Sequence, residues 1–213
     1  MKRKLTFTLF CLMVFLGVHA QEITPNDSTI SSKKEMKVGI RLSPSLNFFD
    51  YGDLSFAQVA SDNKVGFGAG VVFDWKISEY NRARLEPYFE IQNVVNESIN
   101  PNIDAVTSFN NLVFGLDVIP LVITYGGKIK PQLSFGGFAK YYLTTSQETT
   151  FNGNTVSNFE PNTSSLQYGF NYGIGAYIGK RLVEFRYYQS LNDFVESSAV
   201  PNSINQVQLI LVY

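Results

Sequence analysis

The residues that could do chemistry are charged side chains spaced two or four positions apart within otherwise apolar segments. Glu86 and Glu90 are one such pair, and Glu184 and Arg186 are another. Paired carboxylates can carry out general acid–base catalysis. On a strand, however, positions i and i+4 are about 13 Å apart, which is too far for glycoside chemistry. The spacing therefore favours a structural role for these charges, and we expect no enzyme.

The N-terminus has the pattern of a secretory signal peptide over residues 1–20. Lys2, Arg3 and Lys4 form a basic start, residues 5–18 are apolar, and cleavage is expected between Ala20 and Gln21. An anchoring helix is the alternative, but the apolar stretch is shorter than the roughly 20 residues that span a bilayer. Residues 21–36 are then a polar, flexible periplasmic leader.

Removal of residues 1–20 would change the chemistry that the chain can support. It takes away the chain's only Cys and only His and leaves 14 basic and 18 acidic residues, a net charge of −4. Without Cys or His, neither a disulfide nor a Cys/His metal site can form, and a Ser-His-Asp triad is impossible. We expect no metal, no cofactor and, since no basic run is present, no nucleic-acid partner.

The pattern of residues 65–77 shows which element positions the charges. Val, Phe, Ala, Val, Phe, Trp and Ile alternate with Gly, Gly, Gly, Val, Asp and Lys, so one face of a strand is apolar and the other is small or charged. The length fits a tilted strand that crosses a bilayer. The stretch therefore predicts a transmembrane β-barrel with an apolar exterior and a polar lumen.

The same alternation recurs, which predicts an all-β, eight-stranded antiparallel up-and-down transmembrane barrel over residues 37–213. Long and short connections alternate, as they do in outer-membrane barrels, where the long loops are extracellular and both termini are periplasmic. A soluble periplasmic β-domain is the alternative. A bulge or strand end is expected at Pro120. The predicted strands cover residues 37–48, 65–77, 83–95, 111–125, 129–145, 165–179, 182–191 and 204–213.

Strand parity places five cations and five anions inside. A barrel of eight strands is just wide enough to be filled by its own side chains, and buried ions are tolerated when they are paired. We therefore expect a salt-bridge lattice and no continuous pore, with Lys76 and Arg84 at the rim because both are near a turn. The other lumen candidates are Arg41, Asp74, Glu86, Glu90, Asp117, Lys140, Glu184 and Arg186.

Aromatic residues in or beside the long connections predict either a surface for a partner or insertion into the membrane interface. They are Phe49, Tyr51, Phe56, Phe151, Phe159 and Phe194. The terminal Tyr213 resembles the aromatic signal read by the barrel-assembly machinery, with a rim aromatic as the alternative. In the leader, the residues around Ser28 resemble an O-glycosylation acceptor, but an unmodified linker is preferred.

Several runs together resemble the PorT-like outer-membrane β-barrel proteins of Bacteroidetes. They are V-G-F-G-A-G, L-D-V-I-P-L-V-I-T-Y, F-N-Y-G-I-G-A-Y-I-G with V-E-F-R-Y-Y-Q-S-L-N-D, and the C-terminal V-Q-L-I-L-V-Y. Asp117 and Pro120 match the family's pattern, whereas Thr124 stands where a Lys is usual. The resemblance implies the fold and the cell outer membrane, and little about activity.

The sequence thus predicts an integral outer-membrane barrel with a structural or interaction role. Loops on a rigid scaffold carry function in many proteins, so the long loops are the expected contact surface for an unknown extracellular or periplasmic protein. The expected companions in the membrane are outer-membrane lipid and the barrel-assembly machinery. The alternative is a small-solute channel or an accessory component of a secretion or transport system.

Overall fold

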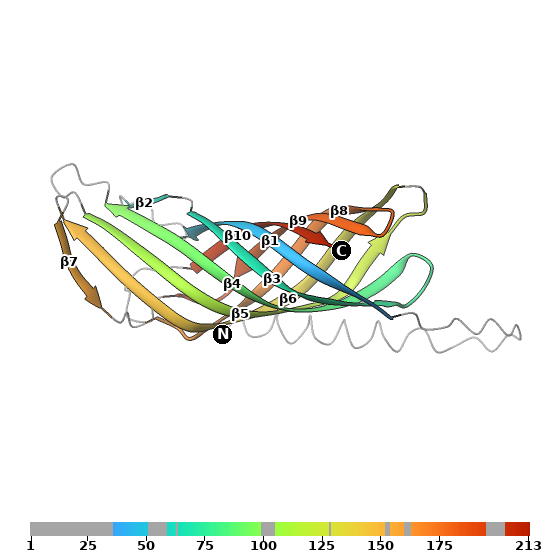
Figure 1. The fold of residues 1–213 in the computed structure, drawn as a ribbon, viewed down its shortest axis with the longest axis horizontal. Coiled ribbons are helices and arrows are strands. Elements are labelled where there is room, and N and C mark those ends of the chain that lie inside the picture. Colours follow the sequence, from blue (N-terminus) through green and yellow to red (C-terminus); the bar gives the residue numbers. More distant parts are fainter. Residues whose placement is uncertain are drawn as a thin grey trace, which may run out of the picture. The chain divides into compact units, whose positions relative to one another are not determined.

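The computed structural model describes residues 36–50, 59–62, 64–98, 105–127, 129–151, 154–159, 163–194 and 203–213. The predicted signal peptide and residues 21–35 of the predicted leader lie outside these ranges. The described residues form ten strands (Figure 1). They are β1 (Met36–Asp50), β2 (Val59–Asp62), β3 (Lys64–Lys76), β4 (Asn81–Ser98), β5 (Ala105–Thr124), β6 (Ile129–Phe151), β7 (Asn154–Phe159), β8 (Leu166–Ile178), β9 (Arg181–Ser190) and β10 (Ser203–Val212).

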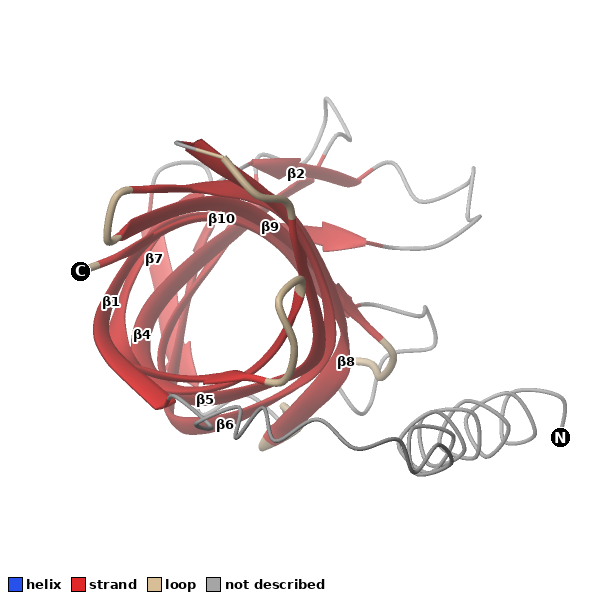
Figure 2. Cartoon of the chain, turned by 90° about the vertical axis from the view of Figure 1, so that its right-hand side faces the viewer, coloured by secondary structure: helices blue, strands red, loops and turns tan. Residues whose placement is uncertain are grey.

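Eight of these strands close into a ring, which Figure 2 shows almost end-on. The order around it is β4-β3-β1-β10-β9-β8-β6-β5, with β5 paired back to β4, and every pairing is antiparallel. The predicted eight-stranded antiparallel barrel is confirmed. Within the described residues, no helix is long and apolar enough to cross a membrane.

The two ends of the barrel differ. At the turn end, residues 77–80, 125–127 and 179–180 lie between consecutive strands, and Tyr213 lies at the same end. Gly127 and Gly179 have φ angles of 143° and 65°, a region that favours glycine in tight turns. At the opposite end, which we call the loop end, longer segments connect the strands.

Strands at the loop end extend further than the alternation predicted. β4 and β5 stay paired as far as Glu97 and Val106, where a polar connection over residues 96–110 was expected, and β5 and β6 stay paired as far as Ala105 and Phe151. Short strands β2 and β7 add to β4 and β6. Residues 144–150 of β6 are all polar, so polar side chains lie on both faces here. On one of these faces, the hydroxyls of the paired Thr107 and Thr149 are 3.3 Å apart. The alternation that marks a strand is therefore missing.

The predicted irregularity at Pro120 is confirmed. Proline has no N–H to give to the ladder, and the register between β5 and β6 shifts between Val118 and Leu121. A second shift, between Arg82 and Arg84 of β4, faces the same part of β5. Both shifts lie close to the turn end, where bulges commonly bend a strand at the rim of a barrel.

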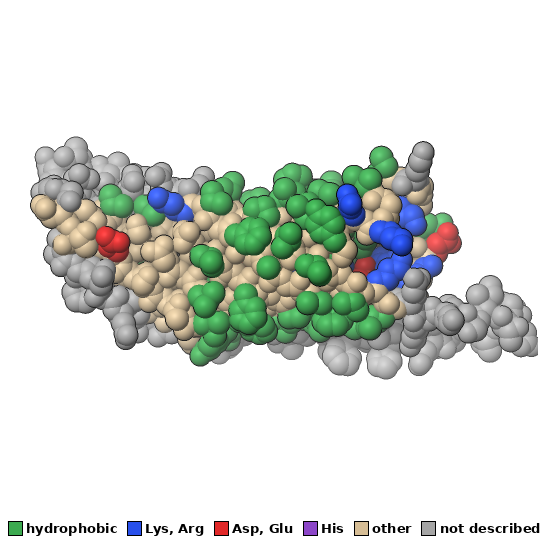
Figure 3. Space-filling view, in the orientation of Figure 1, with side chains coloured by type: hydrophobic (Ala, Val, Ile, Leu, Met, Phe, Trp, Pro, Cys, Tyr) green, Lys and Arg blue, Asp and Glu red, His purple; other side chains and the backbone are tan. Residues whose placement is uncertain are grey.

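The outer surface is apolar in a broad belt (Figure 3). Many large apolar side chains that a soluble protein would bury are exposed here, several of them by more than half. This is the pattern expected where lipid rather than water or protein covers the surface. Aromatic rings pair within it, as do Phe89 and Phe114, whose centroids are 5.3 Å apart. The most exposed members include Val38, Ile40, Phe89, Ile91, Ile174 and Phe185.

Candidate functional site: a closed lumen

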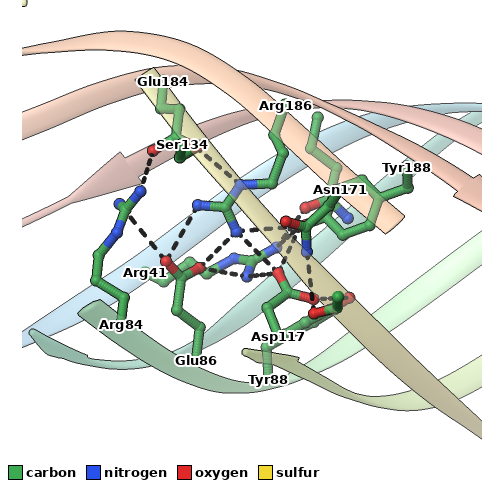
Figure 4. Close-up of polar contacts among 12 residues, drawn as sticks. Arg41, Arg84, Glu86, Tyr88, Asp117, Ser134, Asn171, Glu184, Arg186 and Tyr188 are labelled. Atoms are coloured by element: carbon green, nitrogen blue, oxygen red, sulfur yellow. Dashed lines mark hydrogen bonds and ion pairs between the residues drawn. The ribbon is translucent and has the colours of Figure 1, made fainter. Parts of the chain in front are cut away.

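Six ions from four strands meet in the middle of the lumen, and we call them the central cluster (Figure 4). Each comes from the polar face of a strand whose other face points outward, so the alternation of the sequence carries all six inside. Their side chains are 0% exposed, and the cations and anions balance three to three. The members are Arg41 (β1), Arg84 and Glu86 (β4), Asp117 (β5), and Glu184 and Arg186 (β9).

Two guanidiniums share two carboxylates at the centre of this cluster. Arg41 Nη1 donates to Glu86 Oε2 and Asp117 Oδ2, both at 2.8 Å. Arg186 Nη1 donates to the same two oxygens at 2.8 and 2.9 Å, and Arg186 Nη2 reaches Glu86 Oε1 at 3.1 Å. Charge-assisted hydrogen bonds of this kind are the strongest that side chains make. They join β1, β4, β5 and β9 directly across the lumen.

Toward the turn end, Glu184 accepts hydrogen bonds from several side chains. It accepts from Arg84 Nη2 at 2.8 Å and from Arg186 Nε at 2.9 Å. Gln132 Nε2 and Ser134 Oγ of β6 donate to its two oxygens at 2.6 Å each. The carboxylate therefore has partners on every side, which is what a buried charge requires.

Neutral aromatic hydroxyls complete the cluster on the other side. Tyr188 Oη donates to Asp117 Oδ2 at 2.6 Å, and the Arg41 guanidinium lies 4.0 Å from the centre of the Tyr88 ring. Arg41 also donates to Gln208 of β10. Together with Glu184's partners on β6, these contacts connect the cluster to six of the eight barrel strands.

A separate ion pair lies nearer the loop end. Lys140 Nζ is 3.0 Å from Glu90 Oε2, and Ser45 Oγ donates to the other oxygen of Glu90 at 3.0 Å. Gln206 contacts both ions of the pair. Lys140 also lies 5.0 Å from the centre of the Tyr188 ring, so this pair sits directly against the central cluster.

Beyond this pair, apolar side chains close the loop end of the lumen. Phe194 and Phe109 meet edge to face with centroids 5.6 Å apart, and Tyr142 lies 5.1 Å from Phe194. Phe194 follows β9 and is 0% exposed, so the predicted contact aromatic is instead buried in the barrel mouth. We call these residues the apolar plug; its members are Val94, Phe109, Val113, Tyr142, Phe194 and Ile204.

The inward glycines make room for these side chains rather than for a channel. A Cβ on Gly115 would collide with the Tyr88 ring, and one on Gly173 would collide with Glu184. The space that each missing side chain leaves is therefore taken by a member of the network or its neighbour. The described residues fill the lumen from the central cluster to the apolar plug.

All eight predicted lumen residues are buried and take part in ion pairs, whereas of the two cations predicted at the rim only Lys76 is exposed. Arg84 was expected in water and is 1% exposed, because the barrel continues past it and Glu184 faces it. Lys76 is exposed, and the cation next to Asp74 is Arg82, with Nε 2.7 Å from Asp74 Oδ1. Arg82 falls just before the strand predicted to begin at residue 83, whereas β4 begins at Asn81.

The neutral members of the network were not singled out by the sequence. Tyr88, Tyr188, Gln208 and Gln132 all face inward by parity, which is the signal that could have found them. Among the described residues, no three His, Cys, Asp or Glu side chains come together as a ligand set for a metal. The arrangement neutralises charge and ties strands together.

One surface hollow lies outside the lumen, on β6, β8, β9 and β10. It is an open hollow with a volume of about 440 Å³, and Gly173 is one of the residues that line it. Apart from Ser134 and Arg186, its walls are aromatic and aliphatic and belong to the outer belt. It is therefore suited to hydrocarbon chains. The apolar walls are Leu133, Tyr172, Ile174, Phe185, Tyr187 and Val207.

Comparisons with known proteins assign this chain to no family. No family model matches the chain, and no curated protein is found similar to it. Among solved structures, Neisserial surface protein A aligns with a TM-score of 0.39 and 11% identity over 84% of this chain and 97% of that one. Ail, the attachment invasion locus protein of Yersinia pestis, aligns with a TM-score of 0.36 and 8% identity over 84% and 98%.

A third solved structure, the outer-membrane enzyme PagL, aligns with a TM-score of 0.36 and 15% identity over 81% of this chain and 97% of that one. At these scores, the likeness says nothing about activity or partners. The closed ring of eight strands is established by the strand pairing of this chain itself. The protein has the architecture of a small eight-stranded outer-membrane β-barrel.

Proposed function

We propose that this protein is an integral barrel of the cell outer membrane with a structural or interaction role, and that its loop end is the contact surface. The proposal includes secretion by the signal peptide, assembly through the barrel-assembly machinery, and outer-membrane lipid around the apolar belt. It treats the protein as a non-enzyme without cofactor or metal. Membership of the PorT-like family is part of the same proposal and rests on the sequence runs alone.

One contrast supports the interaction role: the lumen is filled, whereas the strands at the loop end extend further and leave edges. β5 and β6 continue together to Ala105 and Phe151, and β2 and β7 widen the sheet on either side (Figure 1). In the strand pairings of the described residues, β2 pairs only with β4 and β7 only with β6. Unpaired strand edges are templates for strand addition by a partner, which supports a docking role.

A small-solute channel or an accessory role in secretion is the alternative. A channel needs a continuous water path, whereas the central cluster and the apolar plug block the described lumen in series. An accessory role in secretion is compatible with the same contact surface. The filled lumen therefore favours a structural or interaction role over the conduction of solutes.

Site-specific photo-crosslinking in intact cells tests the proposal. A photo-crosslinking residue at Thr155 on β7 or Glu148 on β6 is expected to capture a specific protein partner, because both side chains are exposed at the loop end. The matched control is the same residue at Ile174, which lies in the apolar belt and is expected to capture lipid. Heat-modifiable gel mobility confirms that each variant is folded. Recovery of the protein from the soluble periplasm, or no protein adduct at either loop-end position, would contradict the proposal.

A further inference from the structure

Three side chains bridge the lumen at the turn end, which Figure 2 views from outside. Asp74 of β3 is held by Arg82 of β4 and by Tyr177 of β8, whose Oη donates to Asp74 Oδ2 at 2.6 Å. Strands β3 and β8 lie opposite each other in the ring, so Tyr177 reaches across the lumen. The Arg82 guanidinium lies 5.8 Å from the centre of the Tyr177 ring. We call these three residues the mouth floor.

Buried apolar side chains line the lumen next to the mouth floor. They face inward by parity and lie between the floor and the central cluster. With the central cluster, they separate this end from the rest of the described lumen, so charges here do not line a path for ions. The apolar members are Val72, Ile119, Val122, Leu182 and Ile210.

A lysine lies directly opposite each member of the mouth floor in the strand pairing. Directly opposite residues share a face of the sheet, with Cβ atoms about 5 Å apart, so three flexible ammonium groups surround the floor. All three lysines are exposed. We call them the mouth lysines; the pairs are Lys37 with Asp74, Lys76 with Arg82, and Lys130 with Tyr177.

The turn end therefore carries an excess of positive charge, and Figure 3 shows Lys and Arg side chains gathered there. Arg82 already neutralises Asp74, and the other carboxylates described at this end are Glu79 and the C-terminus. Within the part of the chain that the structure describes, neither Lys76 nor Lys130 is in an ion pair. Like charges that surround one site repel each other, and such a site concentrates ions of opposite charge.

Exposed apolar and aromatic side chains border the same end. Ile77 and Tyr80 lie in the β3–β4 turn and Tyr125 lies in the β5–β6 turn, and each is more than half exposed. The two turns are joined, because the Thr124 N–H donates to the Tyr80 carbonyl at 2.7 Å. Tyrosine is enriched at protein interfaces. A small anion needs no such border, whereas a polypeptide can contact both the cations and the rings.

We propose that the turn end binds an acidic segment of a polypeptide that also carries apolar side chains. Carboxylates of the segment pair with the mouth lysines, and its apolar side chains contact Ile77, Tyr80 and Tyr125. The barrel thereby has a second contact surface, at the end opposite the loop end. In the proposed topology this end faces the periplasm, so the identification of the partner as a periplasmic protein rests on the proposed function.

Fluorescence anisotropy of a labelled peptide tests this binding. The folded protein, in micelles of an uncharged detergent, is titrated against a short Glu-rich peptide that also contains Leu. The control peptide has Gln in place of every Glu. The Glu peptide is expected to bind and the Gln peptide is not. The affinity should fall as salt rises, because salt screens exposed charges.

Variants at the two ends of β3 separate the mouth lysines from general electrostatics. Lys76→Gln and Lys130→Gln should each weaken binding about two- to fivefold, and the double variant should weaken it further. Lys64→Gln, at the loop end of β3, should leave the affinity unchanged. Tyr125→Ser should weaken binding of the Leu-containing peptide more than that of a peptide with Ser in place of Leu. Heat-modifiable mobility shows that each variant is folded.

The outcomes are decisive for this surface. Failure of the Glu peptide to bind would overturn the proposal, and so would equal affinities in Lys64→Gln and Lys76→Gln. Displacement of the peptide by inorganic phosphate at constant ionic strength, with no effect of Tyr125→Ser, would indicate a small-anion site and would also overturn it. The proposed function is tested separately, because crosslinking at Thr155 and Glu148 reports on the loop end and does not involve the mouth lysines.

Discussion

The central cluster and the Asp74–Arg82 pair at the turn end use the same chemistry in different surroundings. In the central cluster the paired side chains are 0% exposed, whereas Arg82 and Asp74 are 14% and 7% exposed. In addition, most central ions have several partners, whereas Asp74 is held by Arg82 and by Tyr177, whose Oη donates to Asp74 Oδ2 at 2.6 Å. The difference indicates that the unfolding free energy lost when an ion pair is broken depends on whether the remaining charge keeps other hydrogen-bond partners or water.

Removal of a central cation is expected to have the largest effect. Arg186→Met leaves Glu86, Asp117 and Glu184 with two guanidiniums among three buried carboxylates. An uncompensated buried charge costs about 3–5 kcal/mol of unfolding free energy. Urea titration followed by heat-modifiable mobility measures the loss. The double variant Arg186→Met/Glu184→Gln should lose less than the two single variants together, and strict additivity would contradict the cluster.

An arginine on the outer face at the same level is the complementary change. Ile174 is 63% exposed and pairs with Phe185, next to Arg186 in the sequence. Ile174→Arg is expected to cost about 2–4 kcal/mol in a bilayer, because the charge enters hydrocarbon. The same titration in vesicles measures it. The control is Ser146→Arg, at an exposed position near the loop end, which should change the unfolding free energy very little. Equal losses of unfolding free energy in the two variants would contradict contact between lipid and Ile174.

Loss of a neutral member of the network should have an intermediate effect. Tyr188→Phe keeps the ring but removes the hydroxyl. That hydroxyl donates to Asp117 Oδ2 and accepts a hydrogen bond from Arg41 Nη2 at 2.9 Å. Hydrogen bonds to charged groups contribute about 1.5–3 kcal/mol each. Urea titration of the variant measures the change. The control is Tyr168→Phe, on the exposed face of β8. An equal loss of unfolding free energy in both variants would contradict a contribution of the Tyr188 hydroxyl to the network.

The smallest effect is expected at the rim. Arg82→Gln breaks the pair with Asp74, but water reaches both groups and Tyr177 still donates to the carboxylate. Ion pairs in water contribute about 0–1 kcal/mol, and less at high salt. This pair, with side chains 14% and 7% exposed, should contribute somewhat more than that and less than the central cluster. Comparison of Arg82→Gln with the unaltered protein at low and high salt measures it. A loss as large as that of Arg186→Met would erase the difference between the two regions.

Much of this organisation follows from the sequence because one face of each membrane-spanning strand is apolar. Residues such as Arg41, Asp117 and Glu184 could be placed inside from parity alone, since every second residue shares a face. The pairing between them could not be predicted, because it depends on register between strands far apart in the chain. Glu86 and Arg186, for example, are 100 residues apart.

The two ends of the barrel were harder to predict. Alternation fails where a strand leaves the apolar environment, so the extensions of β5 and β6 and the strands β2 and β7 were missed. At the turn end, β4 begins at Asn81, two residues before the predicted start, so Arg82 lies on the strand and its Nε is 2.7 Å from Asp74 Oδ1. Phe194 was predicted at a partner surface or in the membrane interface, because no sequence pattern shows that a residue of a connection turns back into the lumen.

The central claim is that side chains close the lumen, and single-channel recording tests it most directly. Purified, folded protein inserted into planar bilayers is predicted to give no sustained ionic steps, in the unaltered chain and in Phe194→Ala alike, because the central cluster remains below the apolar plug. Insertion is verified in the same membranes by protease protection of the barrel. Stable, repeatable conductance steps from the unaltered protein would contradict the closed lumen and favour a channel.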